Sequence, residues 1–195
     1  MESLVLDLNK RYTYADYLTW ADDKMRELID GFIHLMSPAP KLKHQKISGT
    51  IFGNLFKIIE NSKGRCDVFS APFDVRLPQN GEKADELIYN VVQPDICVVC
   101  DKSKLDENGC IGAPDLIVEV ISKSSERRDA IEKKALYEKS GVKEYWIVYP
   151  HDEIIHVYIL QNEKYEYHMV YGVYDKIPVN IFNGNEIKMC DIFKV

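Results

Sequence analysis

The stretch DLIVEVISKSSERRDAIEKKALYEKSGVKEYWIVYP, residues 115–150, sets the architecture that we expect for this chain. Residues 114–122 and 144–150 have the composition of buried strands. The charged segment 125–139 between them has helical character, and Gly141 is its stop signal. A strand, a helix and a strand in this order predict a crossover whose two strands are parallel and buried.

Two acids stand in the first of these strands, Asp115 and Glu119. Asp115 is at the strand's start, where an acid can be solvated or can cap a turn, so we expect it to be structural. Glu119 lies between apolar neighbours, where an ionised carboxylate costs several kcal/mol unless it is paired or binds a ligand. Glu119 therefore needs a partner.

Asp95 is a candidate partner, because Pro94 and Asp95 begin PDICVV within another strand-like run, residues 91–100. If the two strands pair as a hairpin, Asp95 and Glu119 can converge on one side of the sheet. Two close carboxylates repel unless a shared proton or a divalent cation lies between them. Hard oxygen ligands suit Mg²⁺ or Mn²⁺, and the carbonyl group of Val120 could be a further ligand.

A site of this kind suits phosphodiester hydrolysis, which also needs a cation to stabilise the charge of the transition state. The position two residues after Glu119 holds Ile121 rather than lysine. Lys133 and Lys134, on the following helix, are the nearest candidates. A helical wheel with an apolar face of Ala130, Ile131, Ala135 and Tyr137 favours Lys134.

The rest of the chain reads as one α/β domain over residues 1–195, because no linker or internal repeat divides it. We expect a central mixed β-sheet flanked by helices, with a C-terminal β hairpin and tail over 151–195. Further expected elements are a short helix from Thr13, a hairpin over 25–38, a helix over 44–62, and strands over 66–78, 154–162 and 164–172.

Composition places the chain among soluble globular proteins, with 46% hydrophobic and 29% charged residues. We expect a cytoplasmic protein without a membrane segment, because neither a signal peptide nor an apolar run of about 20 residues is seen. The net charge of −6 argues against wholesale coating of nucleic acid. Basic clusters at 41–46 and 123–143 still leave room for a local basic surface.

The five cysteines are spaced irregularly and do not suggest a disulfide framework. Cys97 and Cys100 form a C-x-x-C motif inside a predicted strand, where residues three apart point to opposite faces. We therefore expect small apolar core residues here. A zinc or redox site at this motif is the competing hypothesis.

The chain resembles the PD-(D/E)XK nuclease superfamily and, more narrowly, the restriction endonucleases of the Uma type (Uma-two), over roughly residues 13 to 160. The resemblance is carried by ELIDG (27–31), MSPAPKLKHQKI (36–47), APFDVRL (71–77), VVQPDICVV (91–99) and the long block over 115–150. It implies a restriction-endonuclease-like fold and an endonuclease that hydrolyses DNA with Mg²⁺ or Mn²⁺. It also suggests a homodimer, because cutting two strands favours two sites.

Carried over by position, the resemblance implies that Asp95 and Glu119 bind the metal. It assigns the helical lysine to Lys133, four residues after Asp129, and it matches Glu27 to an N-terminal acid that assists the site. Two further matching positions are assigned only as substrate contacts: these are His44 and Asp74.

This chain departs from the family pattern at Phe32, Lys123 and Tyr149, none of which is a proposed ligand. These departures bear on substrate binding more than on the metal. They keep an alternative open, in which a catalytically silent nuclease-fold domain binds nucleic acid or a protein partner.

Overall fold

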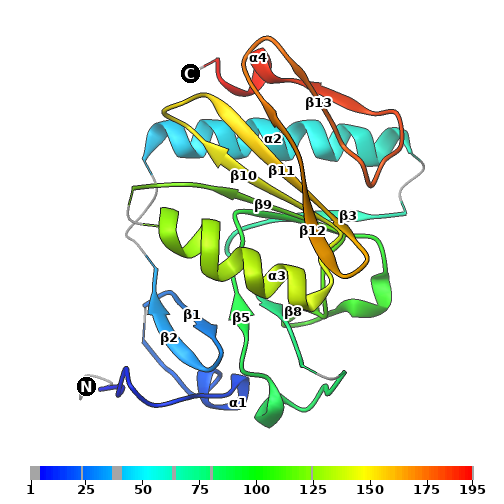
Figure 1. Ribbon diagram of the computed structural model, residues 1–195. Helices are drawn as coiled ribbons and strands as arrows, with labels where there is room; N and C mark the ends of the chain where they lie inside the picture. The colour runs from blue at the N-terminus through cyan, green and yellow to red at the C-terminus, as the bar shows by residue number, and fades with distance from the viewer. Residues whose placement is uncertain are drawn as a thin grey trace.

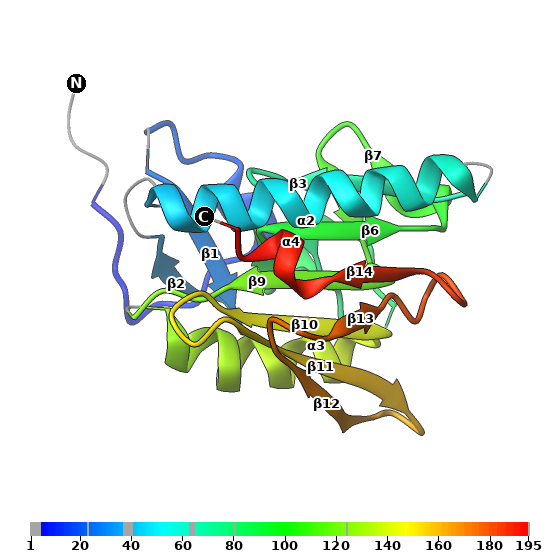
Figure 2. The same ribbon diagram turned by 90° about the horizontal axis from the view of Figure 1, so that it is seen from above.

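A computed structural model of the protein shows a layered α/β architecture (Figure 1). A central sheet lies between α2 (Leu42–Asn61) on one face and α3 (Lys134–Ser140) on the other (Figures 1 and 2). This arrangement matches the expected fold class. The structure describes residues 5–22, 24–36, 41–62, 65–79, 81–123 and 125–194.

The central sheet has six strands in the order β12-β11-β10-β9-β6-β3. β9 pairs parallel with β10 and antiparallel with β6, so the sheet is mixed, as expected. Its strands are β3 (Asp67–Ser70), β6 (Ile96–Val99), β9 (Leu116–Val120), β10 (Glu144–Tyr149), β11 (Ile154–Gln161) and β12 (Lys164–Tyr171).

A second six-stranded sheet, in the order β2-β1-β5-β4-β8-β7, lies beyond α3, and a two-stranded ribbon pairs β13 with β14. The strands of the second sheet are β1 (Arg26–Ile29), β2 (Phe32–Leu35), β4 (Val75–Arg76), β5 (Val91–Val92), β7 (Leu105–Asp106) and β8 (Gly109–Ile111), and those of the ribbon are β13 (Lys176–Pro178) and β14 (Glu186–Lys188).

The remaining helices are short. A π-helical turn, η3, runs directly into α3. The others connect strands or cap the sheet edges. Their bounds are α1 (Tyr14–Tyr17), η1 (Asp85–Leu87), η2 (Lys102–Lys104), η3 (Arg128–Lys133) and α4 (Met189–Ile192).

The amphipathic helix expected over 44–62 is α2, which begins two residues earlier and ends one residue earlier. Its buried stripe is Ile47, Ile51, Leu55 and Ile59, which pack against one face of the central sheet. Because these residues recur every four positions, they lie on one face of the helix. No helix within the described ranges is long and apolar enough to cross a membrane.

The segment β9-η3-α3-β10 is the expected crossover, and it defines two faces of the central sheet. Leu116, Val118 and Val120 belong to the core on the α2 side, whereas Ile117 and Ile121 belong to the core on the α3 side. Successive strand residues alternate between faces. Glu119 therefore points to the α3 side, where the helix can supply a partner.

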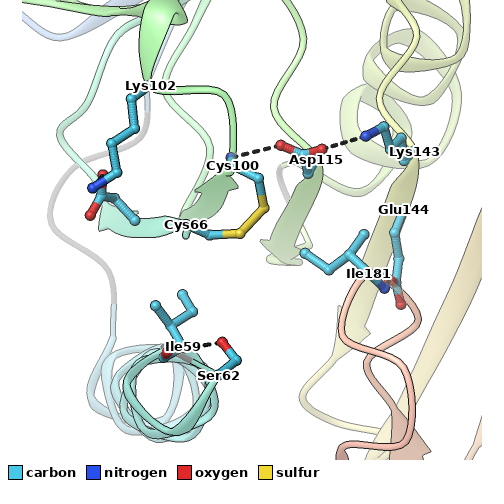
Figure 3. Close-up of a disulfide and its surroundings, with 10 residues drawn as sticks. Ile59, Ser62, Cys66, Cys100, Lys102, Asp115, Lys143, Glu144 and Ile181 are labelled. Carbon is cyan, nitrogen blue, oxygen red and sulfur yellow. Dashed lines mark hydrogen bonds and ion pairs between the residues drawn. A yellow bond between two sulfur atoms is a disulfide. The ribbon is translucent and has the colours of Figure 1, made fainter. Parts of the chain in front are cut away.

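The cysteine expectation is partly wrong. Cys97 is a buried free cysteine, as expected, but Cys100 forms a disulfide with Cys66 (Figure 3). The partners are 34 residues apart, so their pairing depends on the sheet. β3 and β6 pair antiparallel with Asp67 opposite Val99, which places the two flanking cysteines opposite each other.

Asp115 is structural, as expected, although it is buried rather than solvated. Its carboxylate accepts a hydrogen bond from the main-chain nitrogen of Cys100 at 2.8 Å and one from the Lys143 amine at 2.7 Å (Figure 3). These two partners hold the start of β9 against the ends of its neighbours. They leave Asp115 outside the candidate site.

Candidate active site

A buried lysine with three carboxylates forms the centre of the candidate site. The Nζ atom of Lys133 lies 2.7 Å from Oε1 of Glu27, 2.9 Å from Oε1 of Glu119 and 3.7 Å from Oδ1 of Asp129. Lys133 is only 3% exposed, and the three acids are buried with it. Buried charges of this kind persist only when they are paired and hydrogen-bonded.

The members of this group come from three elements. Glu27 is on β1 of the second sheet, Glu119 is on β9 of the central sheet, and Asp129 and Lys133 are on the π-helical turn η3. The structure therefore brings together three of the four residues expected to act in catalysis. Asp129 joins them, and its position four residues before Lys133 is the sequence signal that points to it.

The structure places Lys133, rather than Lys134, beside Glu119. Lys133 faces Glu119, whereas the Nζ atom of Lys134 lies over the ring of Tyr158, 4.1 Å from its centroid. The helical wheel was wrong, because Ile131 is 62% exposed. The buried face of this helix carries the charged residues Asp129 and Lys133. The distribution of apolar residues therefore predicted the wrong face of the helix as the buried one.

Two tyrosines that were not predicted from the sequence donate hydrogen bonds to residues of the site. The hydroxyl of Tyr137 donates to Oε1 of Glu119 at 2.8 Å, and the hydroxyl of Tyr145 donates to the main-chain oxygen of Asp129 at 3.0 Å. Their rings pack edge to face, with centroids 5.1 Å apart. Tyr137 follows Lys133 by one helical turn, which is the signal that could have identified it.

Asp95 directly precedes β6, the strand that pairs with β9. The register pairs Ile96 with Val118, so one step further places Asp95 opposite Glu119. Oδ2 of Asp95 accepts a hydrogen bond from the main-chain nitrogen of Val120 at 2.8 Å. Nε2 of His44, from the first turn of α2, lies 3.2 Å from the same oxygen. β6 and β9 pair antiparallel, as a hairpin would. They are not consecutive strands, however, because β7 and β8 lie between them in the chain.

The site carries more acid than its lysine neutralises. The pKa of Glu119 is raised to about 8, mainly by burial and also by the neighbouring acids, against the lowering effect of Lys133. Burial also raises the pKa of Asp129. Burial lowers the pKa of Lys133, but the carboxylates of Glu119, Glu27 and Asp129 raise it more, so the lysine stays charged.

Burial lowers the pKa of His44, but its hydrogen bond and charge interaction with Asp95 raise it more, so the net shift is upward. The imidazole also contacts the main chain of Val120. His44 therefore stands beside two of the three groups that the sequence assigned to the metal. It is a positive charge at that point when protonated.

Asp74 lies outside the central group. Its Oδ1 accepts a hydrogen bond from Nε2 of Gln93 at 2.7 Å, and the main-chain nitrogen of Gln93 donates to Oε1 of Glu27 at 2.9 Å. Asp74 and Gln93 line a hollow of 340 Å³ at the tip of the β7–β8 hairpin. Asp74 is thus connected to the site through Gln93 and does not reach Glu119.

Basic side chains lie near the site on η3 and at the start of α2. Arg128 is on η3, with Nη1 3.9 Å from Oε2 of Glu27. Arg128 is also close enough to His34 to lower the pKa of that histidine, an effect second to burial. The first turn of α2, which carries His44, also contributes Lys43, and exposed lysines flank it at Lys41 and Lys46. These residues belong to the two basic clusters of the sequence, 41–46 and 123–143.

The donor chemistry of the site fits a hard divalent cation. Asp95, Glu119 and the carbonyl group of Val120 offer oxygen atoms, which Mg²⁺ and Mn²⁺ prefer. The surplus of buried carboxylate over lysine also favours added positive charge. Within the described residues, no three side chains among His, Cys, Asp and Glu form a group that could hold a metal ion. A cation here would therefore keep several of its waters, as Mg²⁺ commonly does.

Comparison with solved structures supports the fold. The chain is similar to a structure described as "Crystal structure of a putative nuclease belonging to DUF820 from Anabaena variabilis ATCC 29413", with a TM-score of 0.71. The match covers 93% of this chain and 97% of that one at 21% sequence identity. At this identity the similarity establishes the fold alone. A comparison with curated proteins finds no match.

A family model matches most of the chain. Residues 14–189 match Uma2, which is described as "Putative restriction endonuclease". The match begins at α1, before the strand β1 that carries Glu27. It includes the whole candidate site and the C-terminal ribbon of β13 and β14. This chain belongs to the Uma2 family.

Proposed function

We propose that the protein is a divalent-metal-dependent endonuclease that hydrolyses phosphodiester bonds in DNA. The observation that carries this proposal is the surplus of carboxylate around Lys133, with Asp95 directly before β6, the strand that pairs with β9. A purely structural network would need only enough acid to balance one lysine. Family membership supports a nuclease of the restriction-endonuclease-like kind.

In this proposal Asp95 and Glu119, with the Val120 carbonyl group, hold Mg²⁺ or Mn²⁺. When bound, such a cation polarises a phosphoryl oxygen and lowers the pKa of a coordinated water. Lys133 supplies fixed positive charge beside Glu119, where negative charge builds during phosphoryl transfer. Glu27 assists by holding the Lys133 amine at 2.7 Å.

The basic side chains near the site support a polyanionic substrate. Arg128 and the α2 lysines can neutralise phosphates, while the acidic remainder of the surface repels them. His44 reaches both this surface and Asp95, so we assign it a contact with the substrate backbone or the attacking water. Asp74 is assigned a substrate contact further from the reacting phosphate, in its own hollow.

We also infer a homodimer, because cutting both strands of DNA favours two sites. The Cys66–Cys100 disulfide weighs against a reducing compartment, since disulfides are rare in the cytosol. Gel filtration with light scattering tests the dimer. Thiol labelling of protein extracted under acid quench tests whether the disulfide exists in the cell.

One observation favours a silent domain as a second candidate. The carboxylate of Glu119 is already hydrogen-bonded to both Lys133 and Tyr137, and Glu119 is only 4% exposed. A closed ion-pair network of this kind can stabilise a fold without any metal. Such a domain would bind nucleic acid or a protein partner through the basic surface without cutting.

The deciding experiment compares the wild type with Glu119→Gln on supercoiled plasmid DNA, with Mg²⁺ and with EDTA. We expect cleavage that needs Mg²⁺ and is absent in the variant. Glu144→Gln is the matched control, because Glu144 is a buried carboxylate on β10 that bonds Trp146 and Ile181 rather than the site. Equal cleavage by the wild type and Glu119→Gln would refute the proposal, and an RNA substrate in parallel tests the choice of DNA.

A thermal melt separates the enzyme from the silent domain. A cation that binds only the folded protein stabilises it by about 2.7 kcal/mol at a concentration of 100 times its dissociation constant. We expect this gain in the wild type and its loss in Glu119→Gln. Binding of DNA without any Mg²⁺ stabilisation would favour the silent domain.

A further inference from the structure

The two oxygens of the Glu119 carboxylate have different surroundings. Oε1 accepts hydrogen bonds from the Lys133 amine at 2.9 Å and from the Tyr137 hydroxyl at 2.8 Å. Among the described residues, no donor reaches Oε2, and Oε2 is not one of the unpartnered atoms that are closed off from solvent. The protein therefore supplies two donors to one oxygen and none of the described donors to the other.

Asp95 shows the same division. Its Oδ2 is paired with the main-chain nitrogen of Val120 and with Nε2 of His44, at 2.8 and 3.2 Å. Within the described part of the chain, Oδ1 has no donor. Asp95 and Glu119 stand one step beyond the Ile96–Val118 pair of the β6–β9 register, and each carboxylate has one oxygen with donors and one without.

Tyr137 is the donor to Glu119 that bonds no other carboxylate of the site. Lys133 divides its amine among Glu27, Glu119 and Asp129. Tyr137 is fully buried, and its ring packs edge to face on Tyr145. Tyr145 in turn donates to the main chain of Asp129, which ties the ring pair to the π-helical turn.

We propose that Tyr137 is a positioning residue, which fixes the Glu119 carboxylate so that Oε2 rather than Oε1 serves a divalent cation. This inference rests on the proposed function, because it assigns a role within the same metal site. Residues that orient a metal ligand through a hydrogen bond commonly change metal affinity ten- to a hundredfold when they are removed. Tyr137→Phe removes the hydroxyl and keeps the ring.

The chain provides a matched control. Tyr165 belongs to the same aromatic cluster, with its centroid 6.2 Å from that of Tyr145, and its buried hydroxyl has no hydrogen-bond partner. Tyr165→Phe therefore deletes a buried tyrosine hydroxyl near the site without removing a hydrogen bond. Any general effect of losing such a hydroxyl appears in both variants.

The test measures Mn²⁺ binding to the folded, full-length protein by calorimetry, without DNA. We expect Tyr137→Phe to bind Mn²⁺ about ten- to a hundredfold more weakly than the wild type, and Tyr165→Phe to bind like the wild type. Placing 4-aminophenylalanine at position 137 restores a ring donor and should recover most of the affinity. Circular dichroism and thermal melts confirm that each variant is folded.

Several outcomes overturn the assignment. Unchanged Mn²⁺ affinity in Tyr137→Phe refutes the positioning role and leaves the proposed function intact. Failure of Tyr137→Phe to fold, or loss of affinity that the 4-amino variant does not recover, gives Tyr137 a structural role instead. Absence of Mn²⁺ binding in the wild type itself overturns both proposals, so the two failures are distinguishable.

Discussion

The amine of Lys133 lies 2.7 Å from Oε1 of Glu27, and this ion pair joins the helix that follows β9 to the first strand of the other sheet. The same amine contacts Glu119 in the central sheet. One side chain thus connects both sheets at the candidate active site. Stability and the proposed chemistry are therefore coupled through Lys133.

Replacing Lys133 by Ala should destabilise the protein by about 3–5 kcal/mol, because removing one partner leaves buried charges uncompensated. Lys134→Ala is the neighbouring control, since it removes only a cation–π contact with Tyr158, worth about 0.5–1 kcal/mol. Urea unfolding followed by circular dichroism measures both changes. Similar losses in the two variants would contradict the buried charge network.

The metal-free protein should become less stable as the pH rises. Burial raises the pKa of Glu119 to about 8 in the folded state, whereas an unfolded glutamate titrates near ~4.3. Between these values the folded state binds more protons, so the free energy of unfolding falls with increasing pH, by at most about 1.4 kcal/mol per pH unit, and levels off above pH 8.

Urea unfolding in EDTA across this pH range tests that slope. Glu119→Gln has no carboxylate to ionise at this position, so its stability should depend less on pH than that of the wild type. If the free energy of unfolding changed equally with pH in both proteins, the pH dependence would not come from Glu119.

Asp95→Asn should abolish the stabilisation of the protein by Mg²⁺, because it removes a proposed ligand while an amide oxygen can still accept the hydrogen bond from Val120. Asp74→Asn should retain that stabilisation, since Asp74 lines a separate hollow and bonds Gln93. Thermal melts with and without saturating Mg²⁺ measure both. Retained stabilisation in Asp95→Asn would exclude this aspartate as a ligand.

Replacing Cys66 and Cys100 together by Ser should lower the free energy of unfolding by about 3–4 kcal/mol, because the disulfide closes a long loop in the unfolded chain. Cys190→Ser is the control, since this free cysteine is only partly buried. Urea unfolding under non-reducing conditions compares the variants. Equal stability of the double variant and the wild type would show that the disulfide does not form in solution.

Much of the fold follows from local sequence pattern. The apolar stripe of α2 and the strand-helix-strand order over 115–150 predict the elements and their parallel pairing, because both signals depend on residues close in the chain. The block around Glu119 also pointed to the candidate site. An acid inside a buried strand requires a partner whatever the rest of the fold is.

Only the tertiary structure decided which partners Glu119 has. Glu27 and Lys133 come from distant elements, and the choice of Lys133 over Lys134 depended on which face of the helix meets the sheet. The disulfide and Tyr145 were missed for the same reason, whereas Asp129 and Tyr137 had a local signal in their helical spacing from Lys133. Periodicity reports hydrophobicity along one element, whereas a buried charge network is stabilised by pairings between elements, which the sequence alone does not determine.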